Sequence, residues 1–93
     1  MVETNTKAIT RVQTGVRIES RLLKVLKALA EHKDMTLGDL LEGIIFHAFE
    51  GRSPFSPETL QVVAKLSELY GLTLTADDSH RLTEWESEEK ADD

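Results

Sequence analysis

Residues 10–18, TRVQTGVRI, alternate polar and apolar side chains, a pattern typical of a half-buried β-strand. One face carries Val12, Thr14, Val16 and Ile18, and the other carries Arg11, Gln13, Gly15 and Arg17. The chain from Ser20 to about Leu69 has helical periodicity instead. A lone strand leaves its backbone N–H and C=O groups unpaired. The strand therefore needs a partner, and the same strand of a second copy, paired across a two-fold axis, can supply one.

Two amphipathic helices are expected directly after the strand. Leucine and alanine recur at three- to four-residue spacing, which predicts a helix from Ser20 to about Lys33. Asp34 then stands where helices commonly end in a left-handed residue. Thr36 is a good N-cap for a second helix to about Phe49, with the strongest apolar periodicity in the chain.

A third helix is expected after the turn EGRSPFSP. Ser56 as N-cap and Pro57 at the first helical position start it, and Gly71 ends it after about Tyr70. A shorter helix is predicted over 76–86. The apolar stripe of the third helix comprises Leu60, Val63, Leu66 and Tyr70, widened by Val62 and Leu69. We expect this stripe to pack on the end of the second helix, where Phe46, Phe49 and Phe55 would form a core cluster.

Charge is distributed unevenly along the 93 residues, whose net charge is −6. Residues 1–36 hold seven Lys/Arg against four acids, a net of +3, whereas residues 37–93 hold four against thirteen, a net of −9. This asymmetry favours an anionic partner at the N-terminal end. The chain has no cysteine, no long apolar run and a polar N-terminus, which together indicate a cytoplasmic protein without disulfides or a signal peptide.

Catalytic and metal-binding patterns are not evident in the sequence. The three histidines, His32, His47 and His80, lie far apart, and no serine has an identifiable base. His47 and Glu50 share a helix face, but further metal ligands are lacking. We therefore expect no enzyme activity, no cofactor and no metal site.

The segment VRIESRLLKVLKALAEHKDMTLGDLLEGII resembles the ribbon-helix-helix DNA-binding proteins, the MetJ/Arc/CopG superfamily. The resemblance covers about residues 11–49. It consists of an alternating strand ending in Val16 and Ile18, then a helix with Leu26, Leu29 and Ala30 at fixed offsets. A short turn with Met35 and Thr36 and a second amphipathic helix over 37–45 complete it.

The resemblance implies a mostly α fold, in which two chains form a ribbon-helix-helix homodimer with an added C-terminal helical segment. It also implies that the protein is a transcriptional regulator whose ribbon enters the DNA major groove. Most members of that family are repressors. Gln13, Gly15 and Arg17 match the base-contacting positions, and Arg17 and Gln13 suit guanine and adenine, respectively. Thr36 and Leu37 match the phosphate-contacting helix start, and Arg11 is a further candidate for phosphate contact. The expected dimer core comprises Val12, Val16, Ile18, Leu22, Leu26, Leu40, Leu41, Ile44 and Ile45.

The predicted organisation has four parts: a flexible arm over 1–9, the DNA-binding and dimerisation domain over 10–50, a helical extension over 51–86 and an acidic disordered tail over 87–93. Two other functions remain open. The chain could be an antitoxin whose residues 52–93 bind a protein partner, or a dimeric scaffold that does not bind DNA. Glu19, where many family members have Ser, Thr, Asp or Pro, is expected to be a weak cap.

Overall fold

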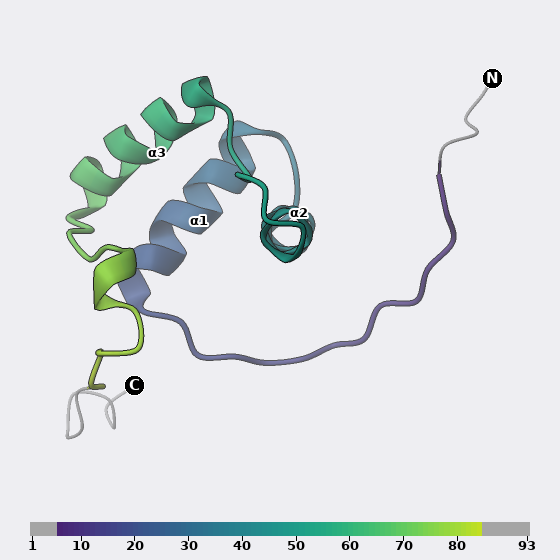
Figure 1. Ribbon diagram of the computed structural model, residues 1–93, viewed down its shortest axis with the longest axis horizontal. Coiled ribbons are helices and arrows are strands. Elements are labelled where there is room, and N and C mark those ends of the chain that lie inside the picture. Colours follow the sequence, from purple (N-terminus) through teal and green to yellow (C-terminus); the bar gives the residue numbers. More distant parts are fainter. Residues whose placement is uncertain (1–5, 85–93) are drawn as a thin grey trace.

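The computed structural model describes residues 6–84 and is mostly α-helical (Figure 1). Helices α1 (Ser20–His32), α2 (Leu37–Phe49) and α3 (Pro57–Tyr70) are followed by the short 3-10 helix η1 (Ala76–Asp78). The three α-helices confirm the ranges predicted from periodicity and capping. Within residues 6–84, no helix is long and apolar enough to cross a membrane.

Each α-helix is preceded by an N-cap residue, whose side chain accepts a hydrogen bond from a backbone N–H group in the first turn. Thr36 accepts from the N–H of Asp39 at 3.0 Å, and Ser56 accepts from the N–H of Thr59 at 3.1 Å. Glu19 also caps α1, because its carboxylate accepts from the N–H of Leu22 at 2.9 Å. These bonds satisfy N–H groups that have no partner within a helix.

The turns that end the helices use left-handed residues. Asp34 has φ +60° in the turn between α1 and α2, as predicted. Gly71 has φ +71° after α3, and Gly51 has φ +70° after α2. A glycine adopts this backbone conformation without the steric penalty that a Cβ atom would add.

The core lies around α1, which contacts both α2 and α3. Leu29 and Ala30 of α1 and Leu40 of α2 form its buried centre. The partly buried apolar residues packed against this centre are Leu26, Ile44, Phe55, Val62, Val63 and Leu66. One short chain thus assembles a small three-helix core from one face of each helix.

Helix α3 packs along α1, side by side with it in Figure 1, so the predicted packing on the end of α2 is wrong. Phe55 joins the core, but Phe46 and Phe49 are largely exposed, and the expected phenylalanine cluster does not form. Val62, Val63 and Leu66 are instead packed against the cluster that contains Leu29 and Ala30 of α1. The physical reason is that an amphipathic helix is stabilised when its apolar face is covered, whichever adjacent apolar surface covers it.

The N-terminal segment, residues 6–19, is extended but has no strand pairing within the described part of the chain. It leaves α1 and runs beneath α2 (Figure 1). Val12 is 81% exposed and Val16 is 73% exposed, so the apolar face predicted for this segment is not buried by its own chain. Residues 6–84 of this single chain therefore do not form the predicted strand, whose pairing in a dimer would need a second copy.

The segment after α3 is mostly non-helical, so the helix predicted over 76–86 is wrong for residues 79–84, and its last two residues lie outside the described part of the chain. After η1, Ser79 has an extended backbone and His80 has φ +71°, which ends the helical path. The predicted disordered tail, 87–93, and residues 1–5 of the predicted arm lie outside the described residues.

Candidate nucleic-acid interface

The predicted base-contacting residues, Gln13, Gly15 and Arg17, all lie exposed in the extended N-terminal segment. Alternate residues of an extended backbone point the same way, so the segment can present these three positions together. Arg17 already has a partner, because its guanidinium forms an ion pair with the carboxylate of Glu84. Sequence reasoning missed Glu84, and the only signal for it was the acidic character of the C-terminal end.

Gly15 is not needed for the backbone geometry of the single chain. Its φ is not positive, and a Cβ added at this position would meet no atom within 4 Å. Gly43 in the middle of α2 is in the same situation. A glycine inside a helix costs about 1 kcal/mol relative to alanine. Any requirement for glycine at these two positions must therefore come from outside the chain described.

Arg11, predicted to contact phosphate, pairs with acidic residues of α2. Its Nε and Nη2 donate to the two carboxylate oxygens of Glu42 at 2.9 and 2.8 Å, and Nη2 also lies 3.4 Å from Asp39. The hydrogen bond and charge of Glu42 raise the pKa of Arg11, and the hydrogen bond from Arg11 lowers the pKa of Glu42. These contacts hold the N-terminal segment against the start of α2.

The start of α2 carries the two other predicted phosphate contacts, Thr36 and Leu37. The Thr36 hydroxyl accepts a hydrogen bond from the backbone N–H of Asp39, so it serves as the N-cap of α2. The N–H groups of the first turn point out of the helix and carry its partial positive charge. Asp39 adds a negative charge there, and Arg11 offsets it from 3.4 Å away.

The start of α1 is fixed by Glu19 and Arg21. Arg21 pairs with Glu19 at 3.1 Å, and its Nη1 donates to the carbonyl of Gly71 at 3.1 Å. Burial raises the pKa of Glu19, but the hydrogen bonds from Leu22 and Arg21 outweigh it, so the pKa is lowered overall. The carboxylate beside the candidate interface thus stays charged and engaged with its own helix.

The predicted dimer-core residues fall into three groups. Leu40 is buried, and Leu26 and Ile44 pack in the core of their own chain. Ile18 and Leu41 are half-buried. The exposed group comprises Val12, Val16, Leu22 and Ile45. Phe46 and Phe49, which were expected in a core cluster at the end of the second helix, extend this exposed apolar surface on α2.

Metal ligands do not gather anywhere within residues 6–84. His47, the histidine with a neighbouring acid in sequence, has its Nδ1 at 2.7 Å from the carbonyl oxygen of Gly43 in the preceding turn of α2.

Comparison with known protein families, curated proteins and solved structures gave no match to this chain.

Proposed function

We propose that this chain is a homodimeric, sequence-specific DNA-binding regulator, most simply a repressor, that inserts a two-stranded ribbon into the major groove. The observation that carries the proposal is the conformation of the N-terminal segment. It is extended and lacks a pairing partner within residues 6–84, and it exposes Val12 and Val16 on one side. Pairing with the same segment of a second chain would satisfy its backbone and cover these side chains.

Features of α2 support a second copy as the partner. Ile45, Phe46 and Phe49 are exposed along this helix, more apolar surface than one short helix normally leaves to water. Gly43 lies on the same helix with open space at its Cβ position. A close approach of another helix would use that space and explain the glycine.

Base readout is assigned to Arg17 and Gln13. A guanidinium can bridge O6 and N7 of guanine, and a carboxamide can bridge N6 and N7 of adenine. The backbone N–H groups at the start of α2 are assigned to phosphate. Arg11 contributes by neutralising Asp39 and Glu42, which would otherwise repel DNA.

Two experiments test the proposal. The melting temperature should rise with protein concentration, because an obligate dimer is stabilised by mass action. A transition independent of concentration, from a particle of the 10.4 kDa monomer mass, would contradict the ribbon.

The second experiment selects duplexes from random DNA at a stated salt concentration, and then measures the affinity of Arg17→Ala and Gln13→Ala. Each should cost about 1–3 kcal/mol on the selected site and relax preference locally. Lys24→Ala, outside the strand, is the control. If Arg17→Ala weakens selected and random duplexes equally, Arg17 does not read bases.

A second candidate function is favoured by exposed leucines on α3. Leu60 and Leu69 remain exposed at the two edges of the apolar stripe of α3, whose centre packs in the core through Val62, Val63 and Leu66. An antitoxin that binds a toxin through residues 52–93 would cover them. Leu60→Ser and Leu69→Ser would then abolish binding of such a partner while leaving DNA binding intact. If the selection from random DNA enriches no duplex, the chain is instead a dimeric scaffold that does not bind DNA.

A further inference from the structure

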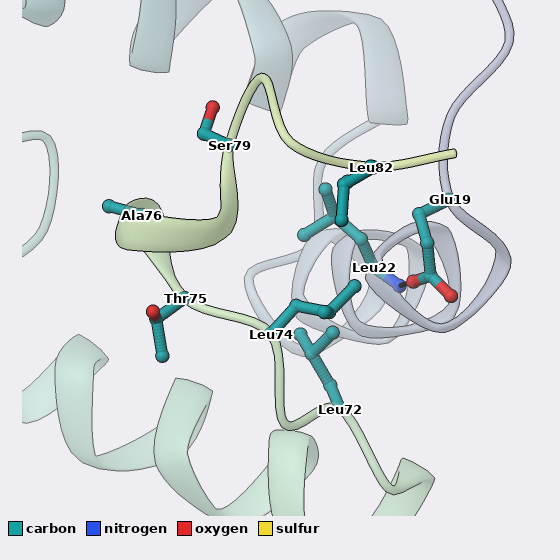
Figure 2. Close-up of a pocket in the computed structure, with 8 residues that line it drawn as sticks. All are labelled: Glu19, Leu22, Leu72, Leu74, Thr75, Ala76, Ser79 and Leu82. Atoms are coloured by element: carbon teal, nitrogen blue, oxygen red, sulfur yellow. Dashed lines mark hydrogen bonds between the residues drawn. The ribbon is translucent and has the colours of Figure 1, made fainter. Parts of the chain in front are cut away.

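The C-terminal segment after α3, residues 72–84, returns to the N-terminal end of α1 (Figure 1). Figure 2 shows Leu72, Leu74 and Leu82 gathered around Leu22 in the first turn of α1. The hydrogen bond from Arg21 to the Gly71 carbonyl fixes the point at which this segment leaves α3. The path brings Glu84 beside the extended N-terminal segment, 67 positions away in sequence from Arg17.

Glu84 pairs there with the residue to which the proposed function assigns base reading. The Arg17 Nη2 group donates to the Glu84 carboxylate. A carboxylate and the O6/N7 edge of guanine both offer two acceptors to a guanidinium. The two therefore compete for the same donors, and Arg17 cannot serve both at once.

We propose that Glu84 lowers DNA affinity by competing with DNA for Arg17. This inference rests on the proposed function. Residues 84–93 contain six acids and one lysine, a net charge of −5, so the sequence beginning at Glu84 has the charge sign of a phosphate backbone. Because the competitor belongs to the same chain, its effective concentration at Arg17 is high and independent of protein concentration.

The Arg17–Glu84 contact weakens DNA binding without preventing it. A half-open pocket of about 300 Å³ lies between the C-terminal segment and the start of α1, lined by the four leucines together with Glu19, Thr75, Ala76 and Ser79 (Figure 2). Both partners of the Arg17–Glu84 pair are more than half exposed, and exposed pairs are weak and screened by salt. A duplex that offers many phosphates can displace it.

The test compares full-length variants on a duplex selected from random DNA at low salt. Glu84→Gln should raise the affinity about two- to fivefold, the range expected for losing one exposed ion pair. Glu50→Gln is the matched control, because Glu50 forms a comparable exposed pair with Arg52 in the turn before α3. It removes the same charge away from Arg17 and should give a clearly smaller gain.

A double-substitution cycle tests the assignment to Arg17. In an Arg17→Gln background, Glu84→Gln should add no more affinity than Glu50→Gln does. If the full gain persists without Arg17, the effect is general charge repulsion and the competition is wrong.

Failure of the inference can be told apart from failure of the proposed function. If the wild type binds a selected duplex and Glu84→Gln binds no better than Glu50→Gln, the competition alone is overturned. If neither wild type nor variants select any duplex, the proposed function falls and the inference falls with it.

Discussion

The α1–α3 pair and the N-terminal segment both carry a row of aliphatic side chains, and they differ in what covers that row. Val62, Val63 and Leu66 of α3 pack against the Leu29 and Ala30 centre of the core within one chain. Val12 and Val16 of the N-terminal segment remain in solvent, together with the exposed apolar side of α2.

The difference follows from the backbone. A helix satisfies its own N–H and C=O groups, so two helices need only an apolar contact and a short turn to associate. An extended segment needs hydrogen bonds from another strand before its side chains can be buried usefully. One chain can therefore complete the helical half of the molecule, while the extended half depends on a partner.

The largest expected effect on stability concerns the helical core, which one chain completes by itself. Leu29 is 1% exposed at the centre of the core, so Leu29→Ala removes buried methyl groups and leaves a cavity. We expect a loss of about 2–5 kcal/mol in the free energy of unfolding. Urea denaturation followed by circular dichroism measures it.

The matched control is Leu69→Ala on the solvent side of α3, where the side chain is 71% exposed. This change should stay within about 0.5 kcal/mol of wild type. Equal effects at the two leucines would mean that α1 and α3 do not form the core described.

The next effect tests the extended half. Val16 is as exposed in the single chain as Leu69, so a monomer should tolerate Val16→Ser as well as Leu69→Ser. If a second copy covers Val16, the same change should cost about 1.5–3 kcal/mol per chain. The loss should be greater at low protein concentration, which thermal melts over a dilution series would detect. Equal tolerance of both substitutions would contradict the ribbon.

The helices could be predicted from sequence because their signals are local. Thr36, Ser56 with Pro57, and Gly71 mark helix ends through bonds or conformations that involve only neighbouring residues. The packing of α3 could not be predicted in the same way. An amphipathic stripe tells which face is buried, but not which of two nearby apolar surfaces receives it.

The candidate interface could be predicted only in part for the same reason. Alternation identified Gln13, Gly15 and Arg17 as one exposed set, which the extended segment retains. The contacts of Arg11 with Glu42 and of Arg17 with Glu84 join residues 31 and 67 positions apart. Surface charges so distant in sequence have many possible partners, and no local rule selects among them.

A smaller effect concerns the start of α2, where the two halves of the molecule meet. Thr36→Ala removes the acceptor for the Asp39 N–H and should cost about 0.5–2 kcal/mol. Thr36→Ser keeps a hydroxyl and should restore most of that loss in the same urea titration. If serine is as unstable as alanine, the methyl group of Thr36 matters and the cap bond does not.

The smallest effect is the dependence of stability on pH at the start of α1. The pKa of Glu19 is lowered in the folded chain, so the charged carboxylate stabilises the fold above its ordinary pKa of about 4.3. That contribution disappears as the pH falls through the lowered folded value. Glu19→Gln should therefore cost about 0.5–1.5 kcal/mol at pH 7, the usual value of one such hydrogen bond. It should also flatten the decline in stability between about pH 5 and pH 3.

Glu31→Gln makes the same charge change on the exposed side of the same helix and is the control. Urea midpoints measured across this range give both profiles. Parallel profiles for wild type, Glu19→Gln and Glu31→Gln would show that the Glu19 carboxylate does not hold α1 in place, and that the extended segment joins the helix without a charged cap.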